Sequence, residues 1–209
     1  MFAILSYMKS LSLSTPHVIV VVGIPGAGKT FFAEQFATTF NAPLLCVDTI
    51  MPTLPNLSPD DAATILKALL PEFLKTGKTL LVDGTGAMRV ERAELARQAK
   101  EAGYQMLIVW VQTDTPTAKQ RSLKPARGTD KQPLSLEAFD YYSRKFSPPH
   151  PSEKYIVLSG KHTYASQAKM LLRKLSAPRS EHAAHSERPE KQTTPVVPKR
   201  PSGNRISIS

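Results

Sequence analysis

Hydrophobic residues recur along the chain as short continuous runs, separated by segments in which they recur every three or four positions. Runs rich in valine, isoleucine and leucine are typical of parallel strands that are covered on both faces. Five such runs predict strands at His17–Gly23, Leu44–Asp48, Thr79–Asp83, Gln105–Gln112 and Tyr155–Ser159. Because these runs alternate with helical segments, we expect a three-layer α/β fold in which helices cover both faces of a five-stranded parallel sheet.

The helical segments carry their own start and stop signals. Ser58 can cap a helix that begins at Pro59, kinks at Pro71 and ends before Gly77. In a parallel sheet of this kind, ligands bind at the carboxyl ends of the strands, so the loops that follow the strands are the places to look for function. Further helices are predicted at Met88–Ala102 and Tyr164–Leu175.

Composition narrows the class of partner. The 209 residues include 27 Lys and Arg against 17 Asp and Glu, a formal charge of +10, which favours nucleotides, phosphorylated metabolites or nucleic acid as partners. Cys46 is the single cysteine, so an internal disulfide is excluded, and no apolar run reaches the roughly 18 residues that span a bilayer. These features predict a cytoplasmic protein without a membrane partner.

The two ends of the chain differ from its body. Residues 1–16 have a short apolar start with no basic segment before it, which predicts a flexible leader rather than a secretory signal. Residues 177–209 hold five of the 18 prolines but no aromatic residue and no leucine, so they cannot build a core. We therefore expect one folded domain over residues 17–176, followed by a disordered basic tail that offers a contact surface for RNA.

The strongest motif follows the first predicted strand and matches G-x-x-x-x-G-K-[ST]. In this motif backbone N–H groups form a nest for phosphates, the lysine (Lys29) reaches the β- and γ-phosphates, and the threonine (Thr30) ligates magnesium. A guanine-reading N-K-x-D motif is missing after the fourth strand, which favours ATP. The sequence thus predicts a site for ATP and Mg²⁺ formed by Gly23, Ile24, Pro25, Gly26, Ala27, Gly28, Lys29 and Thr30. The helix that follows has an apolar face of Phe31, Phe32, Phe36 and Phe40.

Two other predicted strands end in aspartate. The carboxyl ends of parallel strands meet at one edge of the sheet, so Asp48 and Asp83 should both lie near the phosphate-binding loop. Asp83 is the candidate magnesium ligand beside Thr30, and its alternative role is to cap the turn that follows it. Asp48 is the candidate general base that orients a hydroxyl acceptor and takes its proton, and it too could instead cap a local turn.

A basic segment at residues 119–128 follows the fourth strand and is too broken for a long helix. In a small P-loop kinase a lid at this position closes over the triphosphate, and an arginine that stabilises the transferred charge is worth roughly 10³ to 10⁵ in rate. Arg121 and Arg127 are the candidate lid arginines, with a solvated surface stretch as the alternative. The next helix carries Leu136, Phe139, Tyr142 and Phe146 at helical spacing, which favours core packing over base stacking.

In combination these residues resemble the small P-loop kinases, a family grouped with the 5′-end polynucleotide kinases, the zeta toxins and the seryl-tRNA kinases and often labelled AAA-domain kinases. The resemblance covers residues 17–175. Besides the motifs above, it includes Arg89 and Arg92 after the third strand and the Phe146–Glu153 stretch before the fifth. It implies a P-loop NTPase fold with a mobile helical lid, ATP as donor and Asp48 as general base.

One position departs from that resemblance. In the polynucleotide kinases an arginine three residues after the base contacts the phosphate of the substrate, whereas this chain has Met51. We predict an ATP- and Mg²⁺-dependent kinase that transfers the γ-phosphoryl group to a hydroxyl. The acceptor stays open between a nucleic-acid 5′ end and a metabolite or sugar nucleotide. A nucleotide-dependent module that binds RNA or protein without transferring phosphate is a third interpretation.

Overall fold

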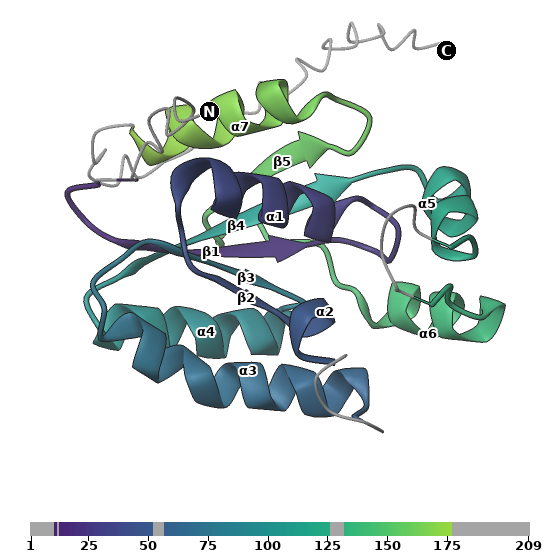
Figure 1. Cartoon of the computed structure of the whole chain (residues 1–209), viewed down its shortest axis with the longest axis horizontal. Coiled ribbons are helices and arrows are strands. Elements are labelled where there is room, and N and C mark those ends of the chain that lie inside the picture. The colour runs from purple at the N-terminus through teal and green to yellow at the C-terminus, as the bar shows by residue number, and fades with distance from the viewer. Residues whose placement is uncertain (1–10, 12, 52–56, 126–131, 177–209) are drawn as a thin grey trace, which may run out of the picture. The chain divides into compact units, whose positions relative to one another are not determined.

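The sheet is fully parallel. The computed structural model describes residues 11, 13–51, 57–125 and 132–176, and its five strands lie in the order β2-β3-β1-β4-β5 (Figure 1). The order places β1, which leads into the predicted phosphate-binding loop, in the middle of the sheet. The strands are β1 (His17–Val22), β2 (Leu44–Cys46), β3 (Leu80–Asp83), β4 (Gln105–Gln112) and β5 (Tyr155–Ser159).

Helices cover both faces of the sheet, as the hydrophobic pattern predicts (Figure 1). On one face lie α1 (Lys29–Phe40) and α7 (Tyr164–Leu175), and on the other lie α3 (Pro59–Leu74) and α4 (Arg89–Glu101). Successive side chains of a strand point to opposite faces. Accordingly Val18, Val20 and Val22 join the cluster under α3 and α4, while Ile19 and Val21 join the cluster under α1 and α7. The predicted three-layer α/β fold is confirmed.

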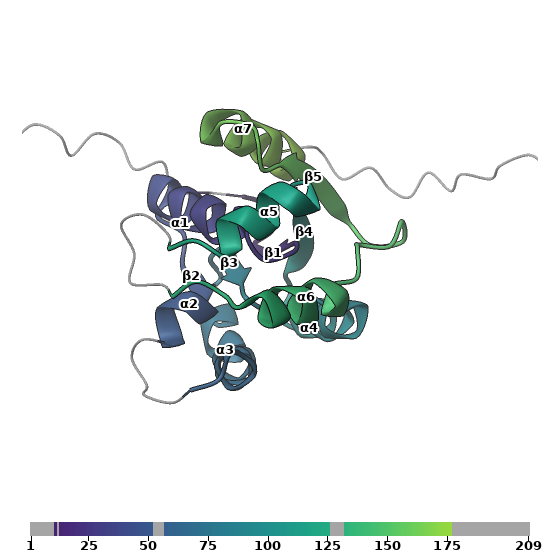
Figure 2. The same cartoon turned by 90° about the vertical axis from the view of Figure 1, so that its right-hand side faces the viewer.

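Three further helices lie at the carboxyl edge of the sheet. They are α2 (Val47–Ile50), α5 (Thr115–Ser122) and α6 (Leu136–Lys145). Figure 2 looks onto this edge, with α5 above and α6 below the end of β1. The predicted lid segment begins within α5, whereas Arg127 lies outside the described residues. On α6 the expected core packing holds for Phe139, which is buried, but Leu136 is exposed.

The helix ends follow local chemistry. The Ser58 hydroxyl accepts a hydrogen bond from the backbone N–H of Asp61 at 3.1 Å, and the Asp61 carboxylate accepts one from the Ser58 N–H at 3.3 Å. This reciprocal cap fixes the start of α3 at Pro59, as predicted. Pro71 lies inside α3, which continues to Leu74.

On α1 the predicted apolar face was wrong at one position, because Phe31 is 61% exposed while the other three phenylalanines are buried.

Two sequence predictions concern membrane crossing and the ends of the chain. None of the described helices combines the length and the apolar character that crossing a membrane requires. The predicted tail, 177–209, and most of the predicted leader, 1–16, lie outside the described residues.

Candidate active site

The loop between β1 and α1 has the shape of a phosphate cradle. Gly28 caps α1 in the left-handed region, so the N–H groups of Lys29 and Thr30 open the helix at its positive end. Gly26 has φ of 73° and lies so close to the carbonyl of Ala118 that no side chain would fit there. The Lys29 ammonium donates to the carbonyl of Ile24 at 3.0 Å, which places its charge beside the loop.

The cradle is braced by the end of β4. The Thr113 hydroxyl donates to the carbonyl of Ala27 at 3.0 Å, across 86 residues of sequence. Gly160, just after β5, packs so closely against Thr113 and Ala27 that a β-carbon there would meet both. The phosphate loop is therefore held from the β4 and β5 side, and its conformation does not depend on local sequence alone.

Two carboxylates meet the Thr30 hydroxyl at the entrance to α1. Thr30 Oγ1 lies 2.6 Å from Asp83 Oδ2 and 3.2 Å from Asp48 Oδ2. Asp83 is buried and Asp48 is half-buried. Three residues that are distant in sequence thus place oxygen atoms around one point beside the phosphate cradle.

The pairing of β2 with β3 brings the two aspartates together. Cys46 lies opposite Asp83 in the parallel register, and β2 ends there. Asp48 therefore does not close a strand, as the sequence predicts, but lies in the first turn of the short helix α2. Gly84 allows this arrangement, because a β-carbon on it would come within 2.5 Å of the Val47 side chain. The turn that carries Asp48 packs directly against the loop that follows Asp83.

Cys46 adds a neutral neighbour to the two carboxylates. Its Sγ lies 3.7 Å from Asp83 Oδ2, within reach of a weak hydrogen bond from the thiol. Burial raises the pKa of Cys46 to about 12, and the negative charges of Asp83 and Asp48 contribute to this shift. The thiol is therefore protonated at neutral pH. Sequence reasoning treated Cys46 only as an unpaired cysteine and missed this contact.

The oxygen donors at this edge fit a hard divalent cation. Mg²⁺ is bound in proteins through one or two carboxylates together with waters and substrate phosphates, rather than by an all-protein cage. Thr30, Asp83 and Asp48 supply a hydroxyl and two carboxylates beside the phosphate cradle. Within the described ranges no group of three or more His, Cys, Asp or Glu has the arrangement of a metal centre.

The candidate lid arginine lies away from the carboxylates. Arg121, at the end of α5, is exposed and donates to the carbonyl of Gly160 at 3.4 Å, beyond the end of β5. The same helix covers the phosphate loop, since Gly26 packs against Ala118 and Ser122. Arg121 thus projects from a helix on top of the cradle, whereas the position of Arg127 lies outside the described residues.

A buried arginine joins the two loops that flank the site. The Arg92 side chain is fully buried, and its Nε and Nη2 donate to the Glu153 carboxylate at 2.8 and 3.0 Å. Its Nη1 donates to the carbonyls of Gly86 at 3.1 Å and Ser147 at 2.9 Å. The guanidinium therefore ties the loop after Asp83 to the segment between α6 and β5. We call this pair the Arg92–Glu153 clamp.

In the sequence, Arg92 and Glu153 stand out only as marks of a family resemblance. Nothing local indicates their pairing, because they are 61 residues apart. The one local signal is the position of Arg92, which lies three residues before Leu95 and seven before Ala99, the spacing of the buried face of α4. Hydrogen bonding and charge from Arg92 hold the pKa of Glu153 below its usual range, against the opposing effect of burial.

Met51 has no polar role in the structure. It caps the end of α2 and packs against the apolar cluster under α3. The position that carries a phosphate-binding arginine in the polynucleotide kinases is thus part of the hydrophobic packing here.

The amino-acid sequence was compared with protein families and with curated proteins. Residues 18–149 match the family described as AAA domain, which is more than half of the chain, and the chain belongs to this family. None of the curated proteins matches the chain in sequence.

Solved structures share the fold at low identity. Chaetomium thermophilum Kti12 in complex with ADP-AlF3 superposes with a TM-score of 0.63 at 19% identity, over 76% of this chain and 96% of the other. A gluconokinase from Sinorhizobium meliloti 1021 superposes with a TM-score of 0.57 at 18% identity, over 77% of this chain and 91% of the other. A sugar kinase from Janibacter sp. HTCC2649 superposes with a TM-score of 0.55 at 18% identity, over 76% of this chain and 92% of the other. The family model confirms the AAA-domain family that the resemblance implies, and the solved structures confirm the predicted P-loop kinase fold.

Proposed function

We propose that this protein is an ATP-dependent kinase that transfers the γ-phosphoryl group of ATP to a hydroxyl acceptor. The observation that carries the proposal is the convergence of Asp48 and Asp83 on the Thr30 hydroxyl at the mouth of the phosphate cradle. A simple nucleotide-binding protein needs the cradle and one metal-binding carboxylate. A second carboxylate at the same point supplies what phosphoryl transfer to a hydroxyl also requires, a group that orients the acceptor.

Each residue of the site then has a distinct task. The backbone N–H groups of the loop and the Lys29 ammonium bind the β- and γ-phosphates of ATP. Thr30 and Asp83 would hold Mg²⁺, which when bound neutralises part of the triphosphate charge. Arg121, on the helix that covers the loop, would approach the phosphates when the lid closes. Arg127 is proposed for the same role on sequence grounds alone.

Asp48 is the proposed general base. Its carboxylate takes the proton of the acceptor hydroxyl as the acceptor oxygen forms a bond to the γ-phosphorus. The bond between that phosphorus and the β,γ-bridging oxygen breaks, and the electron pair leaves with ADP. The half-buried position of Asp48, beside Thr30 and not inside the core, leaves it open to an acceptor.

Replacement of Asp48 tests this assignment. In a transfer assay with γ-labelled ATP and Mg²⁺, Asp48→Asn should reduce transfer by about 10² to 10⁴, the contribution of a positioned base, while ATP binding by calorimetry is retained. Asp60→Asn is the matched control, because Asp60 is an exposed residue at the start of α3 that pairs with Lys145. Equal transfer by Asp48→Asn and Asp60→Asn would remove Asp48 from the mechanism.

The acceptor panel separates the remaining alternatives. It contains 5′-hydroxyl RNA and DNA, nucleosides, sugar nucleotides and sugar acids, the last because one structural relative is a gluconokinase. Label on any acceptor, lost in Asp48→Asn, supports the kinase. Release of free phosphate alone, unaffected by Asp48→Asn, would replace the kinase with a nucleotide-dependent binding module, for which the tail at 177–209 is the candidate RNA contact.

A further inference from the structure

A second cleft opens at the carboxyl edge of the sheet, beside the phosphate loop but apart from the carboxylates. It has a volume of about 590 Å³, within the range of sites for small organic ligands. One of its walls is Ile24 of the phosphate loop, whose carbonyl accepts from Lys29. Its other walls come from the end of β4, the segment after α6 and the edge strand β5. We call it the aromatic cleft.

Two aromatic rings and an open strand face build its apolar walls. The ring centroids of Trp110 and Phe146 are 6.2 Å apart, and the Tyr155 ring meets Trp110 edge to face at a centroid distance of 6.3 Å. These contacts hold the indole in place. Val157 also lines the cleft and is 36% exposed, although it belongs to a strand of the sheet. Rings and aliphatic groups so arranged favour a flat, apolar ligand surface.

The described residues at the rim of the cleft are polar, and Lys161 is the one basic residue among those that line it. Lys161 Nζ lies 2.8 Å from Asp114 Oδ2, so the ammonium is already paired. Lys161 and Thr117 together hold the pKa of Asp114 well below its usual range, so Asp114 stays ionised. Gln112 and Thr113 add an amide and a hydroxyl. Such a rim offers both donors and acceptors to a neutral heterocycle and gives little to a phosphate or a sugar acid.

The cleft lies close enough to the phosphates for one ligand to reach both. It is built at the end of β4, whereas the cradle and Asp83 follow β1 and β3, the next two strands. Neighbouring strands lie about 4.8 Å apart, so the end of β4 lies about 5 Å from that of β1 and about 10 Å from that of β3, a span that a nucleoside can bridge. Met51, which packs against the apolar cluster under α3, offers no charge to an acceptor phosphate.

We propose that the aromatic cleft binds a nucleobase of the acceptor, so that the substrate class of the enzyme is nucleosides or 5′-hydroxyl nucleic acids rather than sugars. This inference rests on the proposed kinase function. The base stacks against the Trp110 and Phe146 wall, and its polar edge meets the groups of the rim. The sugar then extends over the phosphate loop with its hydroxyl toward Asp48.

Because Trp110 is the single tryptophan of the chain, its fluorescence reports ligand binding in the cleft. With the donor site saturated by a non-hydrolysable ATP analogue, adenosine, cytidine and a 5′-hydroxyl trinucleotide should each quench Trp110 fluorescence saturably, and gluconate should not. Val157→Lys places a long side chain in the cleft. It should raise the dissociation constant and the KM for these acceptors roughly tenfold, the effect of losing one stacking contact, with the affinity for ATP unchanged.

Met170→Lys is the matched control, because Met170 is a comparably exposed apolar residue (44%) on α7, which packs on the opposite face of the sheet. It should leave quenching and transfer unchanged. Quenching that the ATP analogue abolishes would make the cleft the donor's base pocket and overturn the proposal. Quenching that Val157→Lys leaves intact would overturn it as well.

The fluorescence titration also separates this inference from the kinase itself. Saturable quenching by nucleosides with no transfer to any acceptor would overturn the acceptor role and, with it, the proposed function. Transfer to a sugar acid, lost in Asp48→Asn but untouched by Val157→Lys, would uphold the kinase and overturn the nucleobase cleft alone.

Discussion

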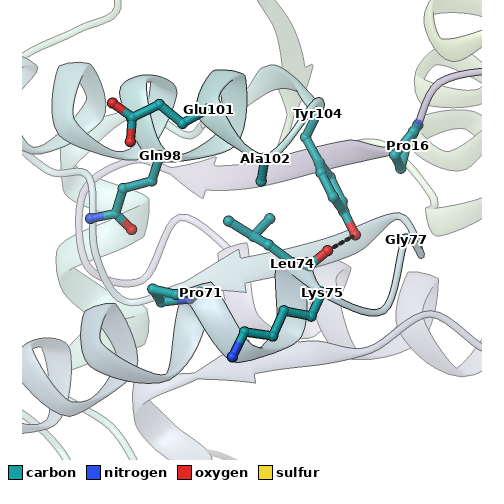
Figure 3. A pocket seen from close by; sticks show the side chains of 9 residues that line it. All are labelled: Pro16, Pro71, Leu74, Lys75, Gly77, Gln98, Glu101, Ala102 and Tyr104. Atoms are coloured by element: carbon teal, nitrogen blue, oxygen red, sulfur yellow. Dashed lines mark hydrogen bonds between the residues drawn. The ribbon is translucent and has the colours of Figure 1, made fainter.

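Two clefts of nearly equal size lie at opposite ends of the sheet, and only one of them adjoins the proposed chemistry. The aromatic cleft, at the carboxyl ends of the strands, has a volume of about 590 Å³, and the cleft in Figure 3 has about 620 Å³. We call the latter the amino-edge cleft, because it lies where α3 and α4 end and β3 and β4 begin. It is lined by Pro16, Pro71, Leu74, Lys75, Gly77, Gln98, Glu101, Ala102 and Tyr104.

The surroundings of the two clefts differ more than their sizes. At the amino edge the Tyr104 hydroxyl donates to the carbonyl of Leu74 at 2.9 Å, which joins the end of α3 to the start of β4 (Figure 3). Lys75 pairs with the exposed Glu72. No helix begins there with a phosphate loop, because in a parallel sheet the loops that precede helices follow the carboxyl ends of the strands. Volume therefore does not identify a site, whereas its position on the sheet does.

This contrast predicts that changes at the amino edge alter stability and leave activity intact. Changes at the carboxyl edge should alter activity. The Arg92–Glu153 clamp is the exception, since it lies at the carboxyl edge but holds the fold together, so it should affect both.

The largest effect is expected from Arg92→Leu. It leaves the Glu153 carboxylate without its charged partner and removes the arginine donor from four loop carbonyls. Breaking a buried ion pair on one side costs about 3 to 5 kcal/mol of unfolding free energy, measurable by urea denaturation. Arg97→Leu is the control on the same helix, where Arg97 pairs at the surface with Glu94 and Glu101, and little change is expected. Equal effects of the two would show that the clamp is not a stabilising unit.

Lys29→Ala should act on turnover and not on folding. Loss of one charge-stabilising donor at a transferred group costs about 10² to 10³ in rate, and ATP binding should weaken with it because Lys29 contacts the phosphates in both states. Lys75→Ala, in the amino-edge cleft, is the matched control and should leave both unchanged. Unaltered ATP affinity of Lys29→Ala in calorimetry would contradict the assignment of the phosphate loop.

Protonation of the clamp should weaken the fold more gently than its removal. The folded-state pKa of Glu153 lies below its unfolded value, chiefly through the hydrogen bond from Arg92. Its stabilising contribution is therefore present above the unfolded pKa and is lost as pH falls through the folded pKa. Urea denaturation between pH 7 and pH 3 should show a smaller acid loss for Glu153→Gln than for the unaltered protein. Glu72→Gln, at the surface, should not change the acid profile, and a parallel profile for Glu153→Gln would refute the prediction.

The smallest effect is expected at the amino edge. Tyr104→Phe removes a buried hydroxyl and its hydrogen bond to the carbonyl of Leu74, which keeps only the backbone N–H of Gly77 at 3.3 Å as a donor. We expect a loss of about 1 kcal/mol in unfolding free energy. Transfer activity, measured at a temperature where both proteins are folded, should not change. Tyr141→Phe is the control, since Tyr141 is exposed on α6. A clear loss of transfer in Tyr104→Phe would break the contrast between the two edges.

Local patterns were enough to predict the phosphate loop and most of the secondary structure. Val18 to Val22 form a continuous apolar run, and the G-x-x-x-x-G-K-T motif follows it, so strand, loop and helix are all encoded within about 25 neighbouring residues. Ser58 and Asp61 fix the start of α3 through bonds that span three residues. The prediction that Phe31 belongs to the apolar face was wrong. The helical spacing that buries Phe32 and Phe36 does not indicate which neighbouring position on the helix stays exposed.

Asp48 and Asp83 show the limit of such patterns. Each could be placed at the carboxyl edge from its strand, but the distance between them depends on which strands are neighbours. In the order β2-β3-β1-β4-β5, Cys46 is the register partner of Asp83, and β2 ends at Cys46, two residues before Asp48. Strand order follows from how whole helices pack on the sheet, and the hydrophobic periodicity within a segment does not predict it.

The amino-acid sequence alone thus determined the α/β class, the phosphate loop and the residues with chemistry to offer, because periodicity, caps and glycine positions act over a few residues. The tertiary structure decided which of those residues meet. It brought Thr30, Asp48 and Asp83 to one point, paired Arg92 with Glu153 across 61 residues and opened the cleft beside Trp110. These contacts depend on long-range packing between elements, and their energies exist only once the sheet is assembled.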